Sequence, residues 1–251
     1  MTLGLLPEAV AGVPIVSVVV IGLIVLVGSF VQGAIGLGLG MFGAPLIALL
    51  EPELVPTLLL LLAVVISSGV MVAEWSHVSW RAIGWALPAR IPGTVLGVWL
   101  ATSFSHQALG ILIAVVVLVA IALTVRTVEV DQTPANLFTA GFAAGTAGTA
   151  AAIGGPPMAI VMAHRPPREV RGTLSVFFVV GSMMSLALFA VEGELPHATL
   201  VLSGLYLPLV VIAFVAATLT HRRIPRDTFR RAVLALCGLS AAVLLVRSAL
   251  G

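Results

Sequence analysis

The sequence contains no lysine, one cysteine and one tyrosine, and charged residues occupy 9% of its 251 positions. Soluble domains usually carry about 25% charged residues, so this composition excludes a soluble globular fold. The single Cys237 excludes an intramolecular disulfide and a thiolate metal cluster, and we interpret it as a small apolar residue in a helix. A net charge of +2 excludes the broad basic surface that binds nucleic acid.

Catalytic signatures are also absent. HExxH, GxSxG and Walker sequences do not occur, so we expect no hydrolysis of substrate or ATP within this chain. Gly38-x-Gly40-x-x-Gly43 matches a dinucleotide-binding pattern, but the strand–helix context of such a site is missing. The five histidines lie in or beside expected loops without metal-ligand spacing. We interpret them as solvated loop residues, with proton coupling by one of them as the alternative. We therefore expect no enzyme activity, no cofactor and no metal.

Hydrophobic residues are abundant, at 60% of the chain, with a mean hydropathy of +1.21. Apolar runs separated by short polar stretches predict a polytopic membrane protein with about ten helical segments. The expected segments are 13–31, 35–50, 55–73, 82–103, 108–126, 135–149, 155–163, 172–191, 198–219 and 229–248. A full crossing needs about 20 helical residues, so the short second, sixth and seventh segments are expected as tilted helices, half-helices or re-entrant pieces. Because no basic region precedes the first segment, it is expected to be retained as a membrane helix.

The twelve arginines predict the orientation of the chain. They cluster at 165–171 and 222–231, and short cytoplasmic loops are enriched in basic residues. Placing both clusters inside also places Arg81 and Arg126 inside. The loops left outside contain no arginine, and they lie near 51–53, 105–106 and 192–194. This arrangement predicts a bacterial-type inner-membrane protein with both termini outside, and Arg247 is its one exception.

A glycine-rich run that ends in proline occurs twice, at 33–46 and at 145–158. At one constant offset, four positions of the first run coincide with four of the second: Gly33, Gly36, Gly43 and Pro45 with Gly145, Gly148, Gly155 and Pro157. Glycine and proline weaken a helix and free backbone groups that lipid cannot satisfy. Two interrupted segments at matching places in two halves are the best sequence indication of a transporter's binding site.

The internal similarity extends beyond these runs. Val55-Pro-Thr57-Leu58 resembles Arg171-Gly-Thr173-Leu174, and Gly84-Trp-Ala-Leu87-Pro88 resembles Gly204-Leu-Tyr-Leu207-Pro208. With five segments in each half, the second half must enter the membrane from the opposite side, which makes an inverted repeat. We therefore predict an all-α polytopic membrane protein with short or broken helices at its centre. The first repeat is expected to cover 1–126, a cytoplasmic linker 127–134, and the second repeat 135–251.

Arg90 lies inside an expected membrane segment. It follows Arg81 by nine positions, or about 13.5 Å along a helix, which places it near the middle of a hydrocarbon core about 30 Å thick. A guanidinium there costs at least about 2.5–3.5 kcal/mol unless it is paired or wetted, and no acidic residue lies in the middle of any expected segment. Pro88 and Pro92 are expected to break the helix and free carbonyls beside it. Arg90 is thus an anion-binding residue or, alternatively, a structural residue that bonds to those carbonyls or lies at a misplaced segment boundary.

The glycine runs also have two interpretations. Gly36-x-x-x-Gly40 and Gly141-x-x-x-Gly145 are typical of close helix packing. The functional interpretation takes Gly43-x-Pro45 and Gly154-Gly-Pro-Pro157 as the starts of short helices, because proline suits the first turn and exposed N–H groups there attract anions. Two such starts can face each other near the midplane of an inverted repeat. The predicted substrate-binding residues are Arg90, Gln32, Gly36, Gly38, Gly40, Gly43, Pro45, Thr146, Gly148, Thr149, Gly154, Gly155, Pro156 and Pro157.

In these residues the chain resembles the sulfite exporter TauE/SafE family. The resemblance extends from about Val13 to Arg247 and rests on Gly33 to Leu46 followed by Val55-Pro-Thr57, and on Gly145 to Met158 followed by Thr173. It implies a transporter of sulfite, sulfonates or other small organosulfur or carboxylate anions. The second run departs from the glycine-rich pattern, with Ala150 and Ala152 in place of Gly38 and Gly40.

The sequence therefore predicts a secondary transporter of small anions, sulfite or an organosulfonate first among them, that works by alternating access at a midplane site between the repeats. The expected partners are the anionic substrate, the lipid bilayer, a coupling ion (proton or sodium) and a second copy in a homodimer, but not nucleic acid. One alternative is a carrier or channel for another solute, such as a metal cation. A cation carrier usually needs intramembrane carboxylates. Another is a membrane scaffold subunit without transport activity, and an intramembrane enzyme is a third.

Overall fold

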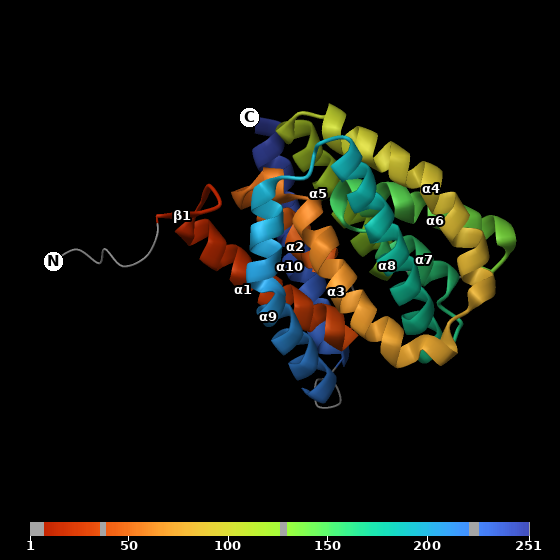
Figure 1. Cartoon of the computed structure of the whole chain (residues 1–251). Helices are drawn as coiled ribbons and strands as arrows, with labels where there is room; N and C mark the ends of the chain where they lie inside the picture. Colours follow the sequence, from red (N-terminus) through yellow and green to blue (C-terminus); the bar gives the residue numbers. More distant parts are fainter. Residues whose placement is uncertain (1–7, 36–38, 126–129, 221–225, 251) are drawn as a thin grey trace.

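The structure, a computed structural model, describes residues 8–35, 39–125, 130–220 and 226–250. Ten α-helices account for nearly all of these residues (Figure 1). Their bounds are α1 Ile15–Ile35, α2 Leu39–Leu50, α3 Thr57–Glu74, α4 Trp80–Ser103, α5 His106–Val125, α6 Pro134–Ala151, α7 Gly155–Val161, α8 Pro167–Val191, α9 His197–Thr220 and α10 Arg226–Leu250. A two-stranded hairpin of β1 (Ala9–Val10) and β2 (Val13–Pro14) precedes α1, and two 3-10 turns occupy Pro52–Leu54 and Trp75–His77.

The predicted all-helical fold is confirmed, and each expected segment corresponds to one helix. Local chemistry explains where several helices begin. Thr133 accepts a hydrogen bond from the backbone N–H of Asn136 (3.2 Å), so α6 starts with a side-chain cap followed by Pro134. Pro167 likewise occupies the first turn of α8. These polar and proline-containing boundaries can be recognised in the sequence.

In the described part of the chain, six helices are long and apolar enough to cross a membrane: α1, α3, α5, α8, α9 and α10. The short helices α2 and α7, with 12 and 7 residues, extend only about 18 Å and about 10 Å. Neither can cross a hydrocarbon core about 30 Å thick. The fourth helix, α4, has 24 residues and is not one of the six, because its arginines and prolines lower its hydropathy.

The helices form pairs of neighbours that are far apart in sequence. α4 packs along α6, α1 along α9, α3 against α8, and α5 against α10 (Figure 1). The short helix α2 lies among these pairs, in contact with α1, α5 and α10. Eight of the ten helices thus pair across the two halves of the chain.

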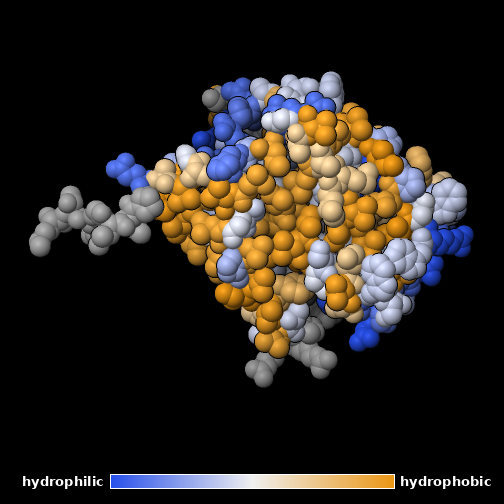
Figure 2. Space-filling model, viewed as in Figure 1, coloured by the Kyte–Doolittle hydropathy of each residue, from blue (hydrophilic) through white to orange (hydrophobic). Residues whose placement is uncertain are grey.

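The outward faces of the long helices are apolar. On α9, the exposed residues include Leu205, Val211, Ile212 and Leu219, each more than 40% exposed. Figure 2 shows a broad hydrophobic surface across the middle of one face, with hydrophilic residues gathered towards its edges. Such a surface is unfavourable in water and suits contact with lipid tails. The chain is therefore an integral membrane protein.

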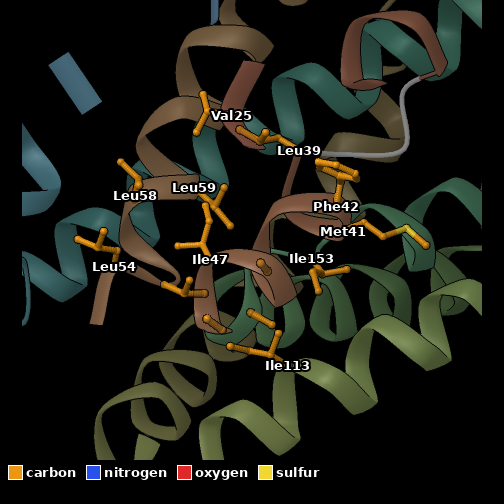
Figure 3. Close-up of a cluster of buried hydrophobic side chains, with 14 of the residues drawn as sticks. Val25, Leu39, Met41, Phe42, Ile47, Leu54, Leu58, Leu59, Ile113 and Ile153 are labelled. Atoms are coloured by element: carbon orange, nitrogen blue, oxygen red, sulfur yellow. The ribbon is translucent and has the colours of Figure 1, made fainter. Parts of the chain in front are cut away.

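The interior has a large apolar cluster around α2. Figure 3 shows Leu39, Met41 and Phe42 of α2 in this cluster with Leu59 of α3 and Ile153 of the turn between α6 and α7. All twelve residues of α2 are apolar, and most of its side chains are buried. A helix that is hydrophobic on all sides is expected in a core position. This burial holds the start of α2 at the centre of the molecule.

Glycines allow α4 and α6 to touch. A Cβ atom at Gly141 of α6 would overlap the carbonyl oxygen of Ala86, and one at Gly145 would lie 2.8 Å from the carbonyl oxygen of Arg90. A Cβ at Gly97 of α4 would lie 2.6 Å from the Cβ of Thr149. The helix-packing interpretation of Gly141-x-x-x-Gly145 is therefore confirmed.

Two local predictions are wrong. Gly43-x-Pro45 does not start a helix, because α2 begins at Leu39 and Pro45 lies inside it. Pro88 and Pro92 do not break α4, which runs without interruption from Trp80 to Ser103. In both helices the missing proline N–H is tolerated because packing against neighbouring helices maintains the helical path.

Candidate functional site

The start of α2 is tied to the end of α1. The side-chain Oε1 of Gln32 accepts a hydrogen bond from the backbone N–H of Leu39 at 2.6 Å. This bond satisfies one of the N–H groups that have no acceptor within the first turn of a helix. Gln32 therefore acts as a cap across the interruption. Gly36 and Gly38, two of the predicted binding residues, lie outside the described residues.

The second interruption lies between α6 and α7. Ala152 ends α6 in the left-handed conformation with φ 58°, and the N–H of the next residue, Ile153, bonds to the Ala147 carbonyl at 3.2 Å. Gly154 then precedes α7, and a Cβ on it would lie 2.9 Å from the carbonyl oxygen of Ala144. The chain can reverse beside α6 here because glycine lets two backbones approach closely.

The two interruptions meet in the interior. A Cβ added to Gly40, in the first turn of α2, would overlap the carbonyl oxygen of Ala152. Met41 and Ile153, the next residues of the two segments, belong to the same buried cluster (Figure 3). Leu39 and Gly40 at the start of α2 and Gly154 directly before α7 are buried. This arrangement is what helix pairs that enter the membrane and turn back inside it would produce.

Arg90 projects from α4 towards this junction. Its side chain is 1% exposed, and its Nη1 donates one long hydrogen bond to the Phe177 carbonyl of α8 at 3.4 Å. The guanidinium carbon lies 4.5 Å from the centre of the Phe177 ring, a favourable cation–π distance. Nε of Arg90 has no hydrogen-bond partner among the described residues, and no carboxylate there forms an ion pair with Arg90.

Gly181 of α8 makes room for this guanidinium. A Cβ at this position would overlap Nε and the guanidinium carbon of Arg90. The carbonyl oxygen of Gly181 accepts a hydrogen bond from Ser185 (2.9 Å), and Ser185 shares another with Thr149 of α6 (2.7 Å). The two buried hydroxyls thus hold α6 and α8 together one turn away from the arginine.

A small cavity of about 40 Å³ opens between these groups. A water molecule needs about 10–15 Å³ on this measure, so the cavity could hold a few waters or one small oxyanion. Its lining comes from seven helices and the α6–α7 turn: Gln32, Leu39, Gly40, Met41, Leu60, Ala63, Ser67, Arg90, Gly148, Ala152, Ile153, Gly154, Gly155, Pro156, Phe178 and Ser182. Arg90 is the one ionisable residue among them.

Exposed tryptophans indicate the depth of the cavity. Trp80 and Trp99, at opposite ends of α4, are 53% and 56% exposed, and tryptophan concentrates at membrane interfaces. They are about 28 Å apart along the helix axis at about 1.5 Å per residue, which matches a hydrocarbon core about 30 Å thick. Arg90 lies midway between them. The tryptophans therefore support a position for the guanidinium near the middle of the membrane.

Comparison with known proteins identifies the family. The family described as Sulfite exporter TauE/SafE matches residues 20–244. The chain belongs to this family. TauE/SafE proteins are membrane transporters of anions, so the chain is a transporter and not an enzyme. It is 28% identical over 234 residues to the Probable sulfite/organosulfonate exporter TauE of Cupriavidus necator, across 87% of this chain and 90% of that protein. No solved structure matches the chain.

Seven of the predicted binding residues of this TauE/SafE protein line the cavity: Gln32, Gly40, Arg90, Gly148, Gly154, Gly155 and Pro156. Five others do not. Gly43 faces Leu59, and Pro45 is buried inside α2. Thr146 donates to the Phe142 carbonyl of its own helix, and the Thr149 hydroxyl bonds to Ser185. Pro157, like Pro156, carries no N–H, so α7 offers fewer backbone donors than predicted.

Several residues that line the cavity or lie near Arg90 have no signal in the sequence. Ser67 on α3 and Ser182 on α8 add hydroxyl groups to the lining, and Phe177 contacts the guanidinium through its ring and its carbonyl. Thr94, one turn beyond Arg90 on α4, is buried, and its hydroxyl has no hydrogen-bond partner among the described residues. Single serines, threonines and phenylalanines in apolar helices are too common to be recognised as site residues without the fold.

Proposed function

We propose that this protein exports a small sulfur oxyanion, sulfite or an organosulfonate, by alternating access at the cavity beside Arg90. The observation that supports this most is the state of Arg90, which is buried, has one weak hydrogen bond and faces no acid among the described residues. A charge inside a membrane is expensive and is usually paired. An anionic substrate would supply the missing partner, as the name of the Cupriavidus necator relative suggests.

The first turn of α2 would complete the anion site. Gly40 and Met41 line the cavity, and their N–H groups belong to the turn that has no acceptor within the helix. The helix dipole adds partial positive charge at the same end. Substrate oxygens would then contact the guanidinium on one side and backbone N–H groups on the other.

Alternating access requires two halves that can exchange roles. Two hydrogen bonds support the inverted repeat on which this part of the proposal rests. Thr57, at the start of α3, bonds to Thr199 at the start of α9 (3.2 Å), and Thr173, near the start of α8, accepts from the N–H of Ser79 before α4 (2.9 Å). In the sequence matches between the halves, Thr57 corresponds to Thr173 and Ser79 corresponds to Thr199. Under the proposed repeat the two bonds would be equivalent contacts, one at the start of α3 and the other just beyond its end.

The helix pairs obey the same relation. In the proposed repeat α1 corresponds to α6 and α4 corresponds to α9, so the contact of α1 with α9 is equivalent to that of α6 with α4. The α3–α8 and α5–α10 contacts each join two corresponding helices. We propose two repeats of residues 1–126 and 135–251, joined by a cytoplasmic linker, with both termini on the outer side of the inner membrane. A proton or sodium ion as coupling ion and a homodimer remain part of the same proposal.

Removal of the guanidinium tests this function. We expect Arg90→Ala to abolish sulfite and organosulfonate flux in proteoliposomes, because the anion would lose its buried partner. Arg81→Ala is the matched control, since Arg81 is exposed at the start of the same helix, and it should transport like the wild type. Both variants should be extracted as folded protein. Wild-type flux in Arg90→Ala would remove Arg90 from the site.

A further inference from the structure

We infer that the cavity selects anions of charge minus one, the protonated bisulfite form of sulfite and short alkylsulfonates, and discriminates against dianions such as sulfate. This inference rests on the proposed function and specifies its substrate class. It follows from the number of charges, the hydrogen-bond donors and the apolar area that surround the guanidinium.

The cavity offers one positive charge. Arg90 is the single ionisable side chain in its lining, and the lining helices α1, α2, α6 and α7 carry no ionisable residue at all among the described positions. α3 and α8 carry theirs at helix ends, as Glu74, Arg168, Glu169 and Arg171, and α4 has only Arg81 besides Arg90. Glu74 is paired with His77, at 3.5 Å. Among the described residues, no second side-chain charge of either sign would face the anion.

The inverted repeat does not supply a second cation. The match between residues 84–88 and 204–208 places Val210 of α9 at the position that corresponds to Arg90. Val210 is buried and apolar. A symmetric site would have opposed two guanidinium groups across the interior and could have neutralised a dianion. Because α9 has Val210 at this position, the site has a single charge.

Burial makes this difference in charge important. A monoanion beside Arg90 forms a neutral pair, whereas a dianion leaves one uncompensated negative charge in a low-dielectric interior, where unpaired ions are strongly disfavoured. The remaining polar groups are neutral. Gln32 has its Oε1 engaged by Leu39, which leaves its amide NH₂ as a donor, and Ser67 and Ser182 contribute hydroxyls. Such groups orient an oxyanion without cancelling a full charge.

The rest of the lining favours an organic substituent. Leu60, Ala63, Phe178 and Ile153 form apolar walls, which suit the hydrocarbon part of an alkylsulfonate. The cavity volume of about 40 Å³ limits this part to a short chain. An alkylsulfonate is permanently monoanionic, whereas sulfite gains its single proton near neutral pH. The cavity therefore accepts both through the same charge state.

The test uses the purified full-length protein in proteoliposomes with labelled ethanesulfonate as the reference substrate. Unlabelled ethanesulfonate, sulfite and sulfate are added as competitors from mildly acidic to mildly alkaline pH. We expect sulfate to compete roughly tenfold or more less effectively than ethanesulfonate, because of its uncompensated charge. Competition by sulfite should weaken as the pH rises, in proportion to its bisulfite fraction, while competition by unlabelled ethanesulfonate, measured against the labelled flux at each pH, stays constant.

Two other outcomes have distinct meanings. Equal competition by sulfate and ethanesulfonate, or competition by sulfite that does not change with pH, would overturn the charge selectivity and leave the proposed function intact. Absence of flux for both ethanesulfonate and labelled sulfite would overturn the proposed function together with this inference. Arg81→Ala, run in parallel, should reproduce the wild-type competition pattern.

Discussion

At the scale of single residues, Arg90 could be found from the sequence because a charge in an apolar segment is rare. Its surroundings could not. The expected acceptors were carbonyls freed by Pro88 and Pro92, whereas the structure gives it the Phe177 carbonyl of another helix. Contacts between residues far apart in the chain depend on how helices pack, and residue spacing within α4 contains no information about α8.

Gly181 provides a prediction at this scale. In Gly181→Ala the new methyl would occupy the position of the Arg90 guanidinium, and the flexible arginine side chain would move to accommodate it. We expect anion flux to fall roughly tenfold, the equivalent of about 1.4 kcal/mol, while the protein remains folded. Flux in proteoliposomes and the thermal unfolding transition measure the two effects.

Gly84 on α4 provides the control for Gly181→Ala. A Cβ at Gly84 would meet no atom within 4 Å, so Gly84→Ala should leave flux unchanged and preserve or slightly increase stability, as is usual for glycine within a helix. Unchanged flux in Gly181→Ala would show that the exact placement of the guanidinium is unimportant for transport.

At the scale of elements, the ten helices were predictable because long apolar runs and polar boundaries specify them directly. The start of α2 was not. The rule that proline prefers the first helical turn pointed to Pro45, but α2 is enclosed by other helices and continues through the proline. Tertiary packing overrode a local preference at this position.

The contact between α4 and α6 gives the second prediction. In Gly141→Ala the added methyl would overlap the carbonyl oxygen of Ala86, a backbone atom that can move only if the helices separate. Overpacking of this kind typically costs about 1–3 kcal/mol, so the unfolding temperature in detergent should fall. Gly204→Ala on α9, where a Cβ meets open space, is the matched control. Equal stability of the two variants would contradict the close contact.

At the scale of the whole molecule, the inverted repeat was inferred from weak sequence matches and the arginine distribution. The hydrogen bonds of Thr57 and Thr173 support the proposed pseudo-symmetry. The sequence could not reveal where the two interruptions meet, because the contact of Gly40 with Ala152 joins segments more than a hundred residues apart. Arg247 lies on the unexpected side of the predicted topology and donates to the Leu49 carbonyl at the end of α2 (2.5 Å).

Cysteine labelling tests the predicted topology. Cys237 is buried and can be replaced by alanine to give a cysteine-free background. A cysteine at His106 or Glu192, both exposed, should react with an impermeant maleimide added outside intact cells. Ser76 and Arg168 are exposed and are predicted to face the cytoplasm. A cysteine at either position should react only after the cells are permeabilised. The reverse pattern would place both termini inside.

The melting temperature of Arg90→Met distinguishes an anion-binding arginine, which has no acidic partner among the described residues, from a structural one. A structural arginine would stabilise the protein, whereas an unpaired buried charge destabilises it. The contact with Phe177 contributes about 0.5–2 kcal/mol, and replacing buried charged groups by apolar ones can stabilise by about 1–4 kcal/mol. The ligand-free variant should therefore melt at the wild-type temperature or higher.

The same measurement with added anion completes the test. Ethanesulfonate at about 100 times its dissociation constant should stabilise the wild type by about 2.7 kcal/mol and should leave Arg90→Met unchanged. Arg81→Ala should respond like the wild type. If ligand-free Arg90→Met melts well below the wild type, or is stabilised by ethanesulfonate to the same extent, then Arg90 is a structural residue and the account of the site is wrong.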